Sequence, residues 1–283
     1  MSNSAVKELQ GEKLPCRPFL KWAGGKSQLL PELIRRIPRN FGKYFEPFIG
    51  GGALFFELQP KQAYISDING ELISTYLAIR DNVDELIHEL GKHRYQKKYF
   101  YSVRAWDRTP DFSKLSAIQR AGRLIFLNKS CFNGLYRVNS ASQFNVPFGR
   151  YKNPKILDME NLRACSAALQ NVEIRCEGFL GVESRTQKGD LVYFDPPYAP
   201  LSPTSNFTTY SAHGFGSKDQ TALRDLCARF DKNGIKFIVS NSSAPLILDL
   251  YRSFNVEFVE ASRAINSKAV GRGKIKETII TNF

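Results

Sequence analysis

A carboxylate, two prolines and a tyrosine follow one apolar run of this chain. Leu191 to Phe194 has the composition of a buried strand, and Asp195-Pro196-Pro197-Tyr198 comes directly after it. Each proline removes a backbone donor and fixes φ at about −65°, which predicts a rigid turn with carbonyl oxygens in set directions. Tyr198 adds a flat ring with a polar tip. Such a turn suits a planar group with an exocyclic amine, such as a flipped nucleobase, although an ordinary Pro-rich strand end is the alternative.

A glycine-rich loop farther upstream is typical of a nucleotide site. Tyr44 to Phe48 predicts a strand, followed by Gly50-Gly51-Gly52 and a short helix over 53–58. Glycines let a ligand approach the backbone, and a helix N-terminus offers free N–H groups. The next predicted strand, 63–66, leads into Asp67, where ribose hydroxyls would lie, or where the acid would cap the next helix. The loop lacks the G-x-G-x-x-G/A spacing, which favours a nucleoside without pyrophosphate over a dinucleotide.

The segment Phe19-Leu20-Lys21-Trp22-Ala23-Gly24-Gly25-Lys26-Ser27 contains a Gly-Lys-Ser sequence like that of a phosphate-binding P-loop. A P-loop needs a glycine five residues before the second one, and position 20 is leucine. We therefore interpret the segment as a Gly-Gly turn flanked by Trp22 and Lys26. These two side chains can pack an aromatic ring and a cation around a small ligand. A helix over 28–36 is expected to follow.

The balance of charge favours a polyanionic partner. The 283 residues include 40 Lys and Arg against 27 Asp and Glu, a formal net charge of +13. Two acid-free segments, Phe112 to Leu157 and Ala261 to Lys276, concentrate the excess. The bases of the first segment are Lys114, Arg120, Arg123, Lys129, Arg137, Arg150, Lys152 and Lys155, and those of the second are Arg263, Lys268, Arg272, Lys274 and Lys276. We expect Arg120 and Arg123 on the surface of a helix over 118–128.

The first acid-free segment also contains a hairpin-like pattern. Two extended runs, Cys131 to Asn139 and Phe144 to Tyr151, flank a polar turn over 140–143 and are rich in Asn, Arg and aromatic residues. Side chains of these types read base edges in the major groove, as in the bidentate pairing of Arg with guanine. The alternative is a surface hairpin with packed aromatics. The position of the pattern among basic residues favours DNA contact.

Alternating strands and helices at both ends of the chain predict a doubly wound, mixed α/β sheet. The sheet portion is expected over 16–68 and 170–283, after a flexible tail over 1–15. The region 69–169 is mainly helical and carries the hairpin, which predicts an inserted recognition domain. A loop over 199–216 is long enough to act as a lid or to contact DNA. Later strands are expected at 172–176, 191–194, 236–240, 256–260 and 277–282, and later helices at 158–169, 217–230 and 244–251.

Cysteine usage and hydropathy exclude several classes of protein. The five cysteines are odd in number and scattered without zinc spacing, which suggests reduced thiols and no metal site. The polar N-terminus does not resemble a signal peptide, and no apolar run approaches 18 residues. We therefore expect a cytoplasmic monomer that does not span a membrane.

Together, the motifs resemble those of Dam-type DNA adenine methyltransferases, which use S-adenosylmethionine. The resemblance covers Phe19 to Phe283, and the order of the motifs is like the family's alpha arrangement. It rests on Phe-Leu-Lys-Trp-Ala-Gly-Gly-Lys, Phe-Glu-Pro-Phe-Ile-Gly-Gly-Gly-Ala, Ser-Asp-Ile-Asn, the hairpin and Asp-Pro-Pro-Tyr. It implies a Rossmann-like methyltransferase fold and methyl transfer to the 6-amino group of a flipped adenine in double-stranded DNA.

The resemblance also implies roles for individual residues. Asp195 and the carbonyl of Pro196, in a turn fixed by Pro197, would hold the adenine amine while Tyr198 stacks on the base. Transfer would then be direct and in line, by positioning more than by activation of a nucleophile. The resemblance implies donor contacts for Trp22, Lys26, Phe48, Gly50, Gly52, Asp67 and Asp195. It implies DNA contacts, and with them GATC specificity, for Lys21, Asn133, Leu135, Arg137, Asn139, Pro147 and Tyr151.

Other functions remain open from the residues alone. The same turn could hold the amine of cytosine, so methylation of the cytosine 4-amino group is the nearest rival. Cytosine-5 chemistry needs a catalytic cysteine, and Pro15-Cys16 lies near the tail with no strand before it. An amine on RNA or protein, or a catalytically silent DNA-binding module, are further alternatives. A restriction endonuclease acting on the same site is a candidate partner in function, with no direct contact implied.

Overall fold

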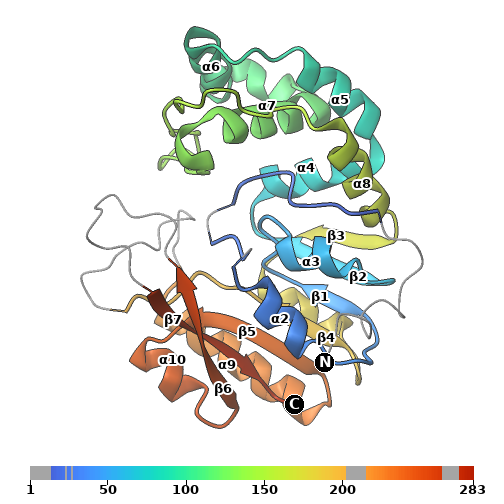
Figure 1. Cartoon of the computed structure of the whole chain (residues 1–283), viewed down its shortest axis with the longest axis vertical. Helices are drawn as coiled ribbons and strands as arrows, with labels where there is room; N and C mark the ends of the chain where they lie inside the picture. Colours follow the sequence, from blue (N-terminus) through green and yellow to red (C-terminus); the bar gives the residue numbers. More distant parts are fainter. Residues whose placement is uncertain (1–13, 23, 27, 202–214, 263–273) are drawn as a thin grey trace.

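The computed structural model describes residues 14–22, 24–26, 28–201, 215–262 and 274–283. Its centre is one sheet (Figure 1). The strands are β1 (Tyr44–Glu46), β2 (Ala63–Asp67), β3 (Val172–Cys176), β4 (Leu191–Phe194), β5 (Lys236–Ser242), β6 (Asn255–Ser262) and β7 (Lys274–Thr281). They lie in the order β3-β2-β1-β4-β5-β7-β6. This is the mixed α/β sheet that the sequence predicted.

The strand order reverses between β1 and β4. The first five strands are parallel, and β7 is antiparallel to both of its neighbours. From β1 the chain continues to β2 and β3 on one side, whereas from β4 it continues to β5 on the other. Ligands of doubly wound sheets bind at the carboxyl ends of the strands beside such a reversal. The glycine loop and the Asp195 turn leave the sheet at this point, because Tyr44 pairs with Leu191 and Phe45 with Val192.

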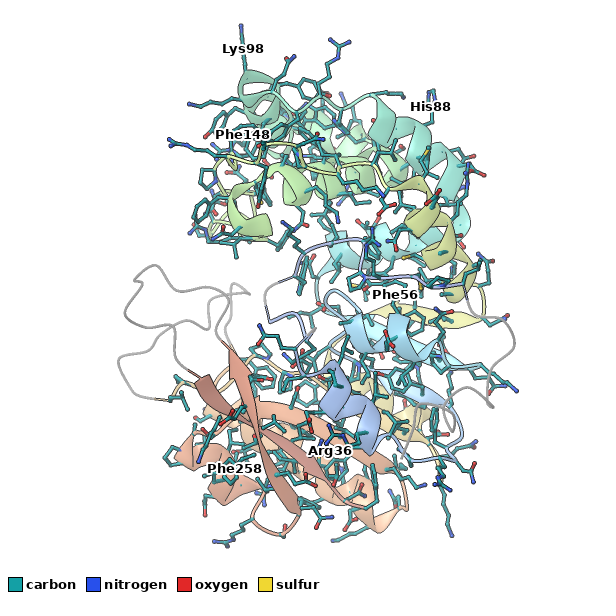
Figure 2. All side chains as sticks on the ribbon, viewed as in Figure 1. Arg36, Phe56, His88, Lys98, Phe148 and Phe258 are labelled. Atoms are coloured by element: carbon teal, nitrogen blue, oxygen red, sulfur yellow. The ribbon has the colours of Figure 1, made fainter. Side chains whose placement is uncertain are left out.

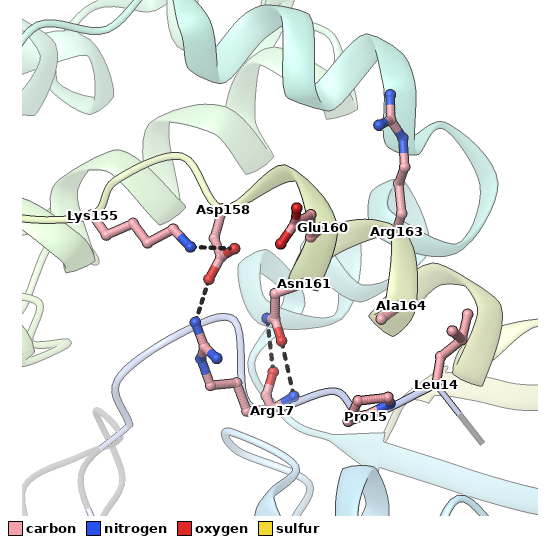
Figure 3. A pocket seen from close by; sticks show the side chains of 9 residues that line it. All are labelled: Leu14, Pro15, Arg17, Lys155, Asp158, Glu160, Asn161, Arg163 and Ala164. Carbon is pink, nitrogen blue, oxygen red and sulfur yellow. Dashed lines mark hydrogen bonds and ion pairs between the residues drawn. The ribbon is translucent and has the colours of Figure 1, made fainter. Parts of the chain in front are cut away.

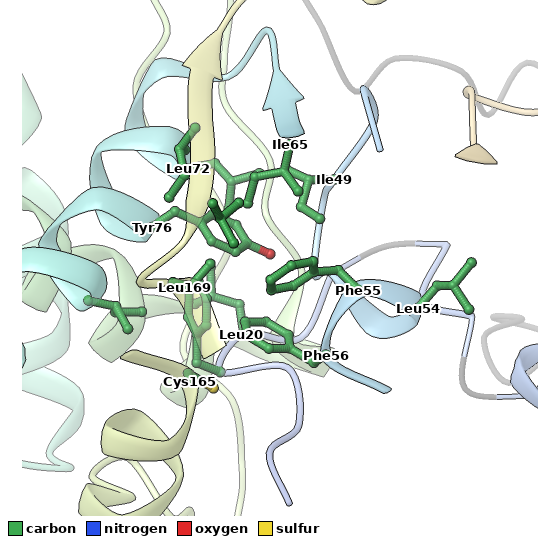
Figure 4. Packing of buried hydrophobic residues seen from close by; sticks show 14 of the residues in the cluster. Leu20, Ile49, Leu54, Phe55, Phe56, Ile65, Leu72, Tyr76, Cys165 and Leu169 are labelled. Carbon is green, nitrogen blue, oxygen red and sulfur yellow. The ribbon is translucent and has the colours of Figure 1, made fainter. Parts of the chain in front are cut away.

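Helices cover both faces of the sheet. One face packs against α2 (Leu30–Arg36), α3 (Ala53–Leu58), α4 (Gly70–Asp81) and α8 (Met159–Leu169), and the other against α9 (Ser217–Lys232) and α10 (Pro245–Leu250). Alternation along β4 supplies both cores, since Tyr193 faces the first layer while Val192 and Phe194 face the second. In the first layer, side chains from α3, α4 and α8 meet those of β2 (Figure 4). The doubly wound prediction is therefore confirmed.

The stretch between β2 and β3 is mainly helical. Besides α4 and α8 it contains α5 (Val83–Gly91), α6 (Lys97–Arg104), α7 (Ala117–Ser130) and the 3-10 turns η1 (Ala105–Arg108), η2 (Pro110–Lys114) and η3 (Phe132–Gly134). α5 to α7 lie beyond α4 from the sheet, with His88 and Lys98 at their outer surface (Figure 2). A small separate core joins α6, the end of α7 and the hairpin, through residues such as Phe100, Phe126 and Phe144. The buried side chains of α4, α5 and α8 belong instead to the core of the first layer.

The hairpin over 131–151 differs from two regular strands. Its halves form no regular ladder, and the strand pairing between them consists of two isolated antiparallel bridges, Cys131 with Phe148 and Val138 with Phe144. The left-handed backbone at Asn133 (φ 55°) and Gly134 (φ 64°) turns the first half into η3, which breaks the strand. Most of the predicted 199–216 loop lies outside the described residues, as do residues 263–273 of the second acid-free segment (Ala261 to Lys276). Lys274 and Lys276 of that segment lie in β7. None of the described helices has the length and apolar character that a bilayer crossing requires.

Candidate active site

The carboxylate of Asp195 is held from two sides. Lys26 Nζ lies 2.7 Å from its Oδ1, and Ser240 Oγ donates a hydrogen bond to the same oxygen at 2.8 Å. The Lys26 ammonium also donates to the Gly24 carbonyl at 2.7 Å and lies 4.5 Å from the centre of the Tyr198 ring. Burial raises the pKa of Asp195, although Lys26 and Ser240 favour its ionised form. A carboxylate and an aromatic face thus converge on one amine.

Tyr198 is fixed at its polar end. Its hydroxyl donates to Glu277 Oε2 of β7 at 2.9 Å, and burial raises the pKa of the phenol well above its ordinary value. The ring is therefore neutral, and it cannot rotate away without losing the bond to Glu277. The turn presents a flat apolar face beside Asp195.

The glycine loop is shaped by Trp22 and by Tyr76 of α4. A Cβ at Gly50 would lie 2.8 Å from Trp22 Cδ1, and one at Gly52 would lie 2.7 Å from the Tyr76 hydroxyl. Both glycines have a left-handed backbone, with φ of +46° and +69°. The Tyr76 hydroxyl donates to the Gly50 carbonyl at 3.0 Å. Glycine is required at both positions for steric and conformational reasons.

Asp67 connects this loop to the end of β2. Its Oδ2 accepts from the Gly50 amide at 3.2 Å, and its Oδ1 accepts from the Asn69 amide at 2.9 Å. Helix α4 is capped by Asn69, whose side chain accepts from the Leu72 amide at 3.1 Å, so the alternative of an Asp67 cap is wrong. Burial raises the pKa of Asp67. The carboxylate stands beside the glycine loop, where it can accept from hydroxyl groups.

Phe48 belongs to an aromatic wall on the other side of the loop. Its ring stacks on Phe179 (centroids 5.5 Å apart) and meets the edge of Phe215 at 5.7 Å. Beside β2, Ile68 exposes 64% of its surface directly after Asp67. An apolar wall, a carboxylate and a close-approach glycine loop fit a nucleoside, so the residues present fit the expected methyl donor.

Glu46 stands in the Phe-Glu-Pro-Phe motif but received no role from the sequence, and the structure places it near Asp195 and Lys26. It ends β1, is 2% exposed, and accepts from the Tyr44 hydroxyl at 2.7 Å. Burial, with a smaller effect from the nearby Asp195 carboxylate, raises the pKa of Glu46 to about 8. Its position was the available signal, because Asp67 and Asp195 also stand where parallel strands end. Three acids thus stand at the carboxyl ends of three neighbouring strands, β2, β1 and β4.

Lys21 is brought against the hairpin, as a shared DNA surface would require. Asn128 of α7 fixes its backbone, accepting from the Lys21 amide at 2.8 Å and donating to its carbonyl at 2.7 Å. Lys21 Nζ lies 4.7 Å from the centre of the Tyr151 ring. A Cβ at Gly134 would overlap the Lys21 side chain at Cδ, so glycine makes room for this lysine. Lys21, Tyr151 and the hairpin backbone form one contiguous group.

The other hairpin residues divide into exposed and internal groups. Asn133, Arg137 and Pro147 are exposed, and Arg137 Nε donates to Asn145 Oδ1 at 2.7 Å. Asn139 stabilises the polar turn, because its Oδ1 accepts hydrogen bonds from the amides of Gln143 at 2.9 Å and Ala141 at 3.1 Å. Leu135 is half-buried against the small core. These side chains do not all meet at one point.

Tyr136 connects the hairpin to the side of the site that carries the glycine loop. Its ring stacks on Trp22, with centroids 5.0 Å apart and planes at 20°. Trp22 in turn lies against Gly50. The stack links the hairpin to the glycine loop through one pair of rings.

Some bases of the first acid-free segment are used within the fold. Arg123 is 5% exposed and pairs with Asp107 at 2.7 Å, so its expected surface position is wrong. Arg120 is half-buried and pairs with Glu71. Lys114 and Lys155 pair with Asp111 and Asp158. Within the described ranges, the segment's bases with no carboxylate within 4.0 Å are Lys129, Arg137, Arg150 and Lys152.

A cavity of about 370 Å³ lies apart from these groups, between the N-terminal segment and α8 (Figure 3). Arg17 and Lys155 both pair there with Asp158, and Asn161 binds the backbone of Arg17 through two hydrogen bonds of 3.0 Å. The cavity shares no lining residue with the Asp195 site. The part of the chain that the structure describes contains no cluster of acids, histidines or cysteines suited to a metal ion.

The sheet order, the glycine loop after β1, and the acids after β2 and β4 define a Rossmann-like methyltransferase. A family model described as D12 class N6 adenine-specific DNA methyltransferase matches residues 22–265. The chain belongs to this family and is an adenine-specific DNA methyltransferase, which confirms the resemblance seen in the motifs.

Curated relatives match along nearly their whole length. The chain is 48% identical to the type II methyltransferase M1.LlaDCHI of Lactococcus lactis subsp. cremoris, over 97% of this chain and 98% of that protein. It is 42% identical to the type II methyltransferase M.MjaIII of Methanocaldococcus jannaschii, over 94% and 99%. A DNA adenine methylase of Vibrio cholerae is 34% identical, over 93% and 95%.

Proposed function

We propose that the chain transfers a methyl group from S-adenosylmethionine to the 6-amino group of adenine within GATC in double-stranded DNA, after the base is flipped out of the helix. The observation that carries this proposal is the pairing of Asp195 with the Tyr198 ring. Between them they already hold an amine, that of Lys26, at 2.7 Å from the carboxylate and 4.5 Å from the ring centre. A base amine needs the same acceptor and the same flat face.

The proposed donor site lies along the ends of β1 and β2. Asp67 would accept from ribose hydroxyls, and the Phe48 and Phe179 wall would contact the adenine moiety. Gly50 and Gly52 give the close backbone approach, and Trp22 and Lys26 close the site from the N-terminal segment. The donor supplies an electrophilic methyl group on a sulfonium.

The proposed catalytic work of the protein is positioning. Asp195 and the carbonyl of Pro196 would accept from the two amine hydrogens, which turns the nitrogen lone pair out of the plane of the base. Tyr198 would stack on that plane, and its bond to Glu277 limits rotation of the ring. Holding the amine in line can account for much of the barrier reduction, because the reacting atoms no longer search for an orientation.

We further propose that residues 69–169 recognise the target, while 16–68 and 170–283 bind the donor. Exposed Arg137, oriented by Asn145, suits a guanine edge, and Lys21 approaches from the N-terminal segment. Asn133, Leu135, Asn139, Pro147 and Tyr151 complete the proposed recognition set. A restriction endonuclease with the same site would be a partner in function, and the relatives named type II methyltransferase support that context.

A transfer assay tests the proposal. The protein is incubated with labelled S-adenosylmethionine and either a GATC duplex or one with that site scrambled, and the DNA is digested to nucleosides. Label in 6-methyladenine from the GATC duplex alone is expected. Label from both duplexes would remove the GATC assignment, and label in 4-methylcytosine would overturn the base. The variant Asp195→Ala serves as the control, expected to bind DNA without transfer.

A further inference from the structure

The Asp195 turn has few backbone amides of its own with which to form stabilising hydrogen bonds. Pro196 and Pro197 have no N–H group, so two successive positions lack the donor that an ordinary turn would use. The two rings fix φ and restrict ψ at Pro196, and contacts from outside the turn set what remains of the direction of its carbonyl. Methyl transfer by positioning depends on that direction, because a misplacement of about 1 Å can cost about 10²-fold in rate.

The end of β5 supplies part of this support through three consecutive residues. Ser240 Oγ donates to Asp195 Oδ1 at 2.8 Å. Asn241 Oδ1 accepts from the Ala199 amide at 3.1 Å, and Ser242 Oγ donates to the Ala199 carbonyl at 2.6 Å. The turn is thus held at its first residue and just beyond its last. All three β5 side chains are buried.

Gln220 of α9 holds the middle of the turn. Its Nε2 donates to the Pro197 carbonyl at 2.9 Å, and its Oε1 accepts from Asn241 Nδ2 at 3.1 Å. The side chain is 1% exposed, so water does not substitute for either bond. Helix α9 and strand β5 are thereby joined through the turn itself.

The two proline carbonyls are treated differently. Gln220 takes the Pro197 oxygen, whereas no hydrogen bond from a described residue reaches the Pro196 oxygen. The Pro197 carbonyl is thus occupied, and the carbonyl of the buried Pro196, next to Asp195, keeps its capacity to accept a hydrogen bond. The buried amide of Gln220 thus distinguishes between the carbonyls of two neighbouring prolines.

We infer that Gln220, Asn241 and Ser240 are positioning residues for the methyl acceptor, with Gln220 determining that the Pro196 carbonyl receives the substrate amine. This inference rests on the proposed function. None of the three acts by touching the methyl group. They act through the turn, as one network of buried hydrogen bonds.

Gln220→Glu is the first test, because it preserves shape and still accepts from Asn241 while losing the donor to Pro197. An ionised carboxylate in place of the Gln220 amide would repel that carbonyl, and a protonated one would donate to it. We expect kcat to fall by about 10- to 100-fold at high pH and to recover partly as pH falls, with KM for DNA and donor affinity changed by less than about threefold. The matched control is Gln170→Glu, since Gln170 Nε2 also donates to a backbone carbonyl, that of Arg80, at 2.9 Å.

If Gln220→Glu does not fold, the variant Ser240→Ala tests the positioning role of the network. Loss of the hydroxyl removes a donor that favours ionised Asp195, so the acid limb of the kcat profile should move to higher pH, and Ser240→Thr should restore it. The inference is overturned, and the proposed function is not, if Gln220→Glu keeps the wild-type kcat at high pH. The same holds if the acid limb of the kcat profile does not move in Ser240→Ala. Absence of methyl transfer by the wild-type protein overturns the proposed function instead.

Discussion

Lys26 Nζ lies 2.7 Å from Oδ1 of Asp195, so the carboxylate proposed to hold the base amine holds a side-chain amine in this structure. The same ammonium lies 4.5 Å from the centre of the Tyr198 ring. One ring face and one carboxylate oxygen cannot serve both a lysine and a stacked adenine. A base that uses this oxygen and this ring face therefore requires Lys26 to move away from Asp195.

Lys26→Met should change the pH dependence of transfer. Without the ammonium, Asp195 keeps its burial and loses its main stabilising charge, so its pKa rises further. An adjacent cation changes a carboxyl pKa by about 1–3 units. The pair exists in the free enzyme, so we expect the acid limb of the kcat/KM profile to move to higher pH within that range. The control is Lys43→Met. The ammonium of Lys43 pairs with Glu173 at 3.2 Å, at a place remote from the Asp195 turn. If the acid limb of the profile stays at the same pH in Lys26→Met, the ion pair between Lys26 and Asp195 does not control the ionisation of Asp195.

Arg137→Ala should relax recognition at one guanine. Exposed guanidinium groups pair bidentately with guanine, and we expect a loss of roughly 1–3 kcal/mol of discrimination at that position. Transfer rates on duplexes with each single base of GATC replaced would locate the position. Asn145→Ala, which removes the acceptor that orients Arg137 Nε, should reduce discrimination at the same base. If site preference is unchanged in both variants, Arg137 does not read the site.

The sequence predicted the centre of the sheet because β1, β2 and β4 are largely apolar runs that each end at an acid, and these local patterns persist in the fold. The Asp195 turn and the glycine loop were predictable for the same reason. Glu46 was not, because its burial depends on Tyr44 and on the neighbouring β4, which is distant along the chain. The predicted exposure of Arg123 was wrong because the spacing of residues along a helix cannot reveal that Asp107 would lie beside it.

Glu46→Gln should flatten the dependence of stability on pH. The pKa of Glu46 is raised from 4.5 to about 8 in the folded protein, so between these values the unfolded chain is ionised while the folded one keeps its proton. The folded state then binds more protons, and the free energy of unfolding falls as pH rises through this window. Urea unfolding across the window should show this slope in the wild type and lose it in the variant. Glu57→Gln, at an exposed position of α3, is the control, and an equal slope in Glu46→Gln would contradict the assignment.

Arg123 and Arg120 lie on one helix and should differ sharply in their contribution to stability. Arg123 pairs with Asp107 at 2.7 Å with both side chains buried, and Asp107 also accepts from the Phe144 amide at 2.8 Å. Arg123→Ala removes one of the two cations on Asp107 and leaves Arg108 as the other. We therefore expect a loss below the about 3–5 kcal/mol of a buried pair that loses its only partner, but above that of a surface pair.

Arg120→Ala provides the matched comparison, because the Arg120 pair with Glu71 is partly exposed and contributes about 1 kcal/mol or less. Urea unfolding of both variants measures the difference. Arg123→Ala should in addition loosen the hairpin, since Asp107 anchors the amide of Phe144, so DNA affinity should fall while donor affinity stays unchanged. Equal losses of stability in the two variants would mean that the buried pair does not hold the hairpin against the helices.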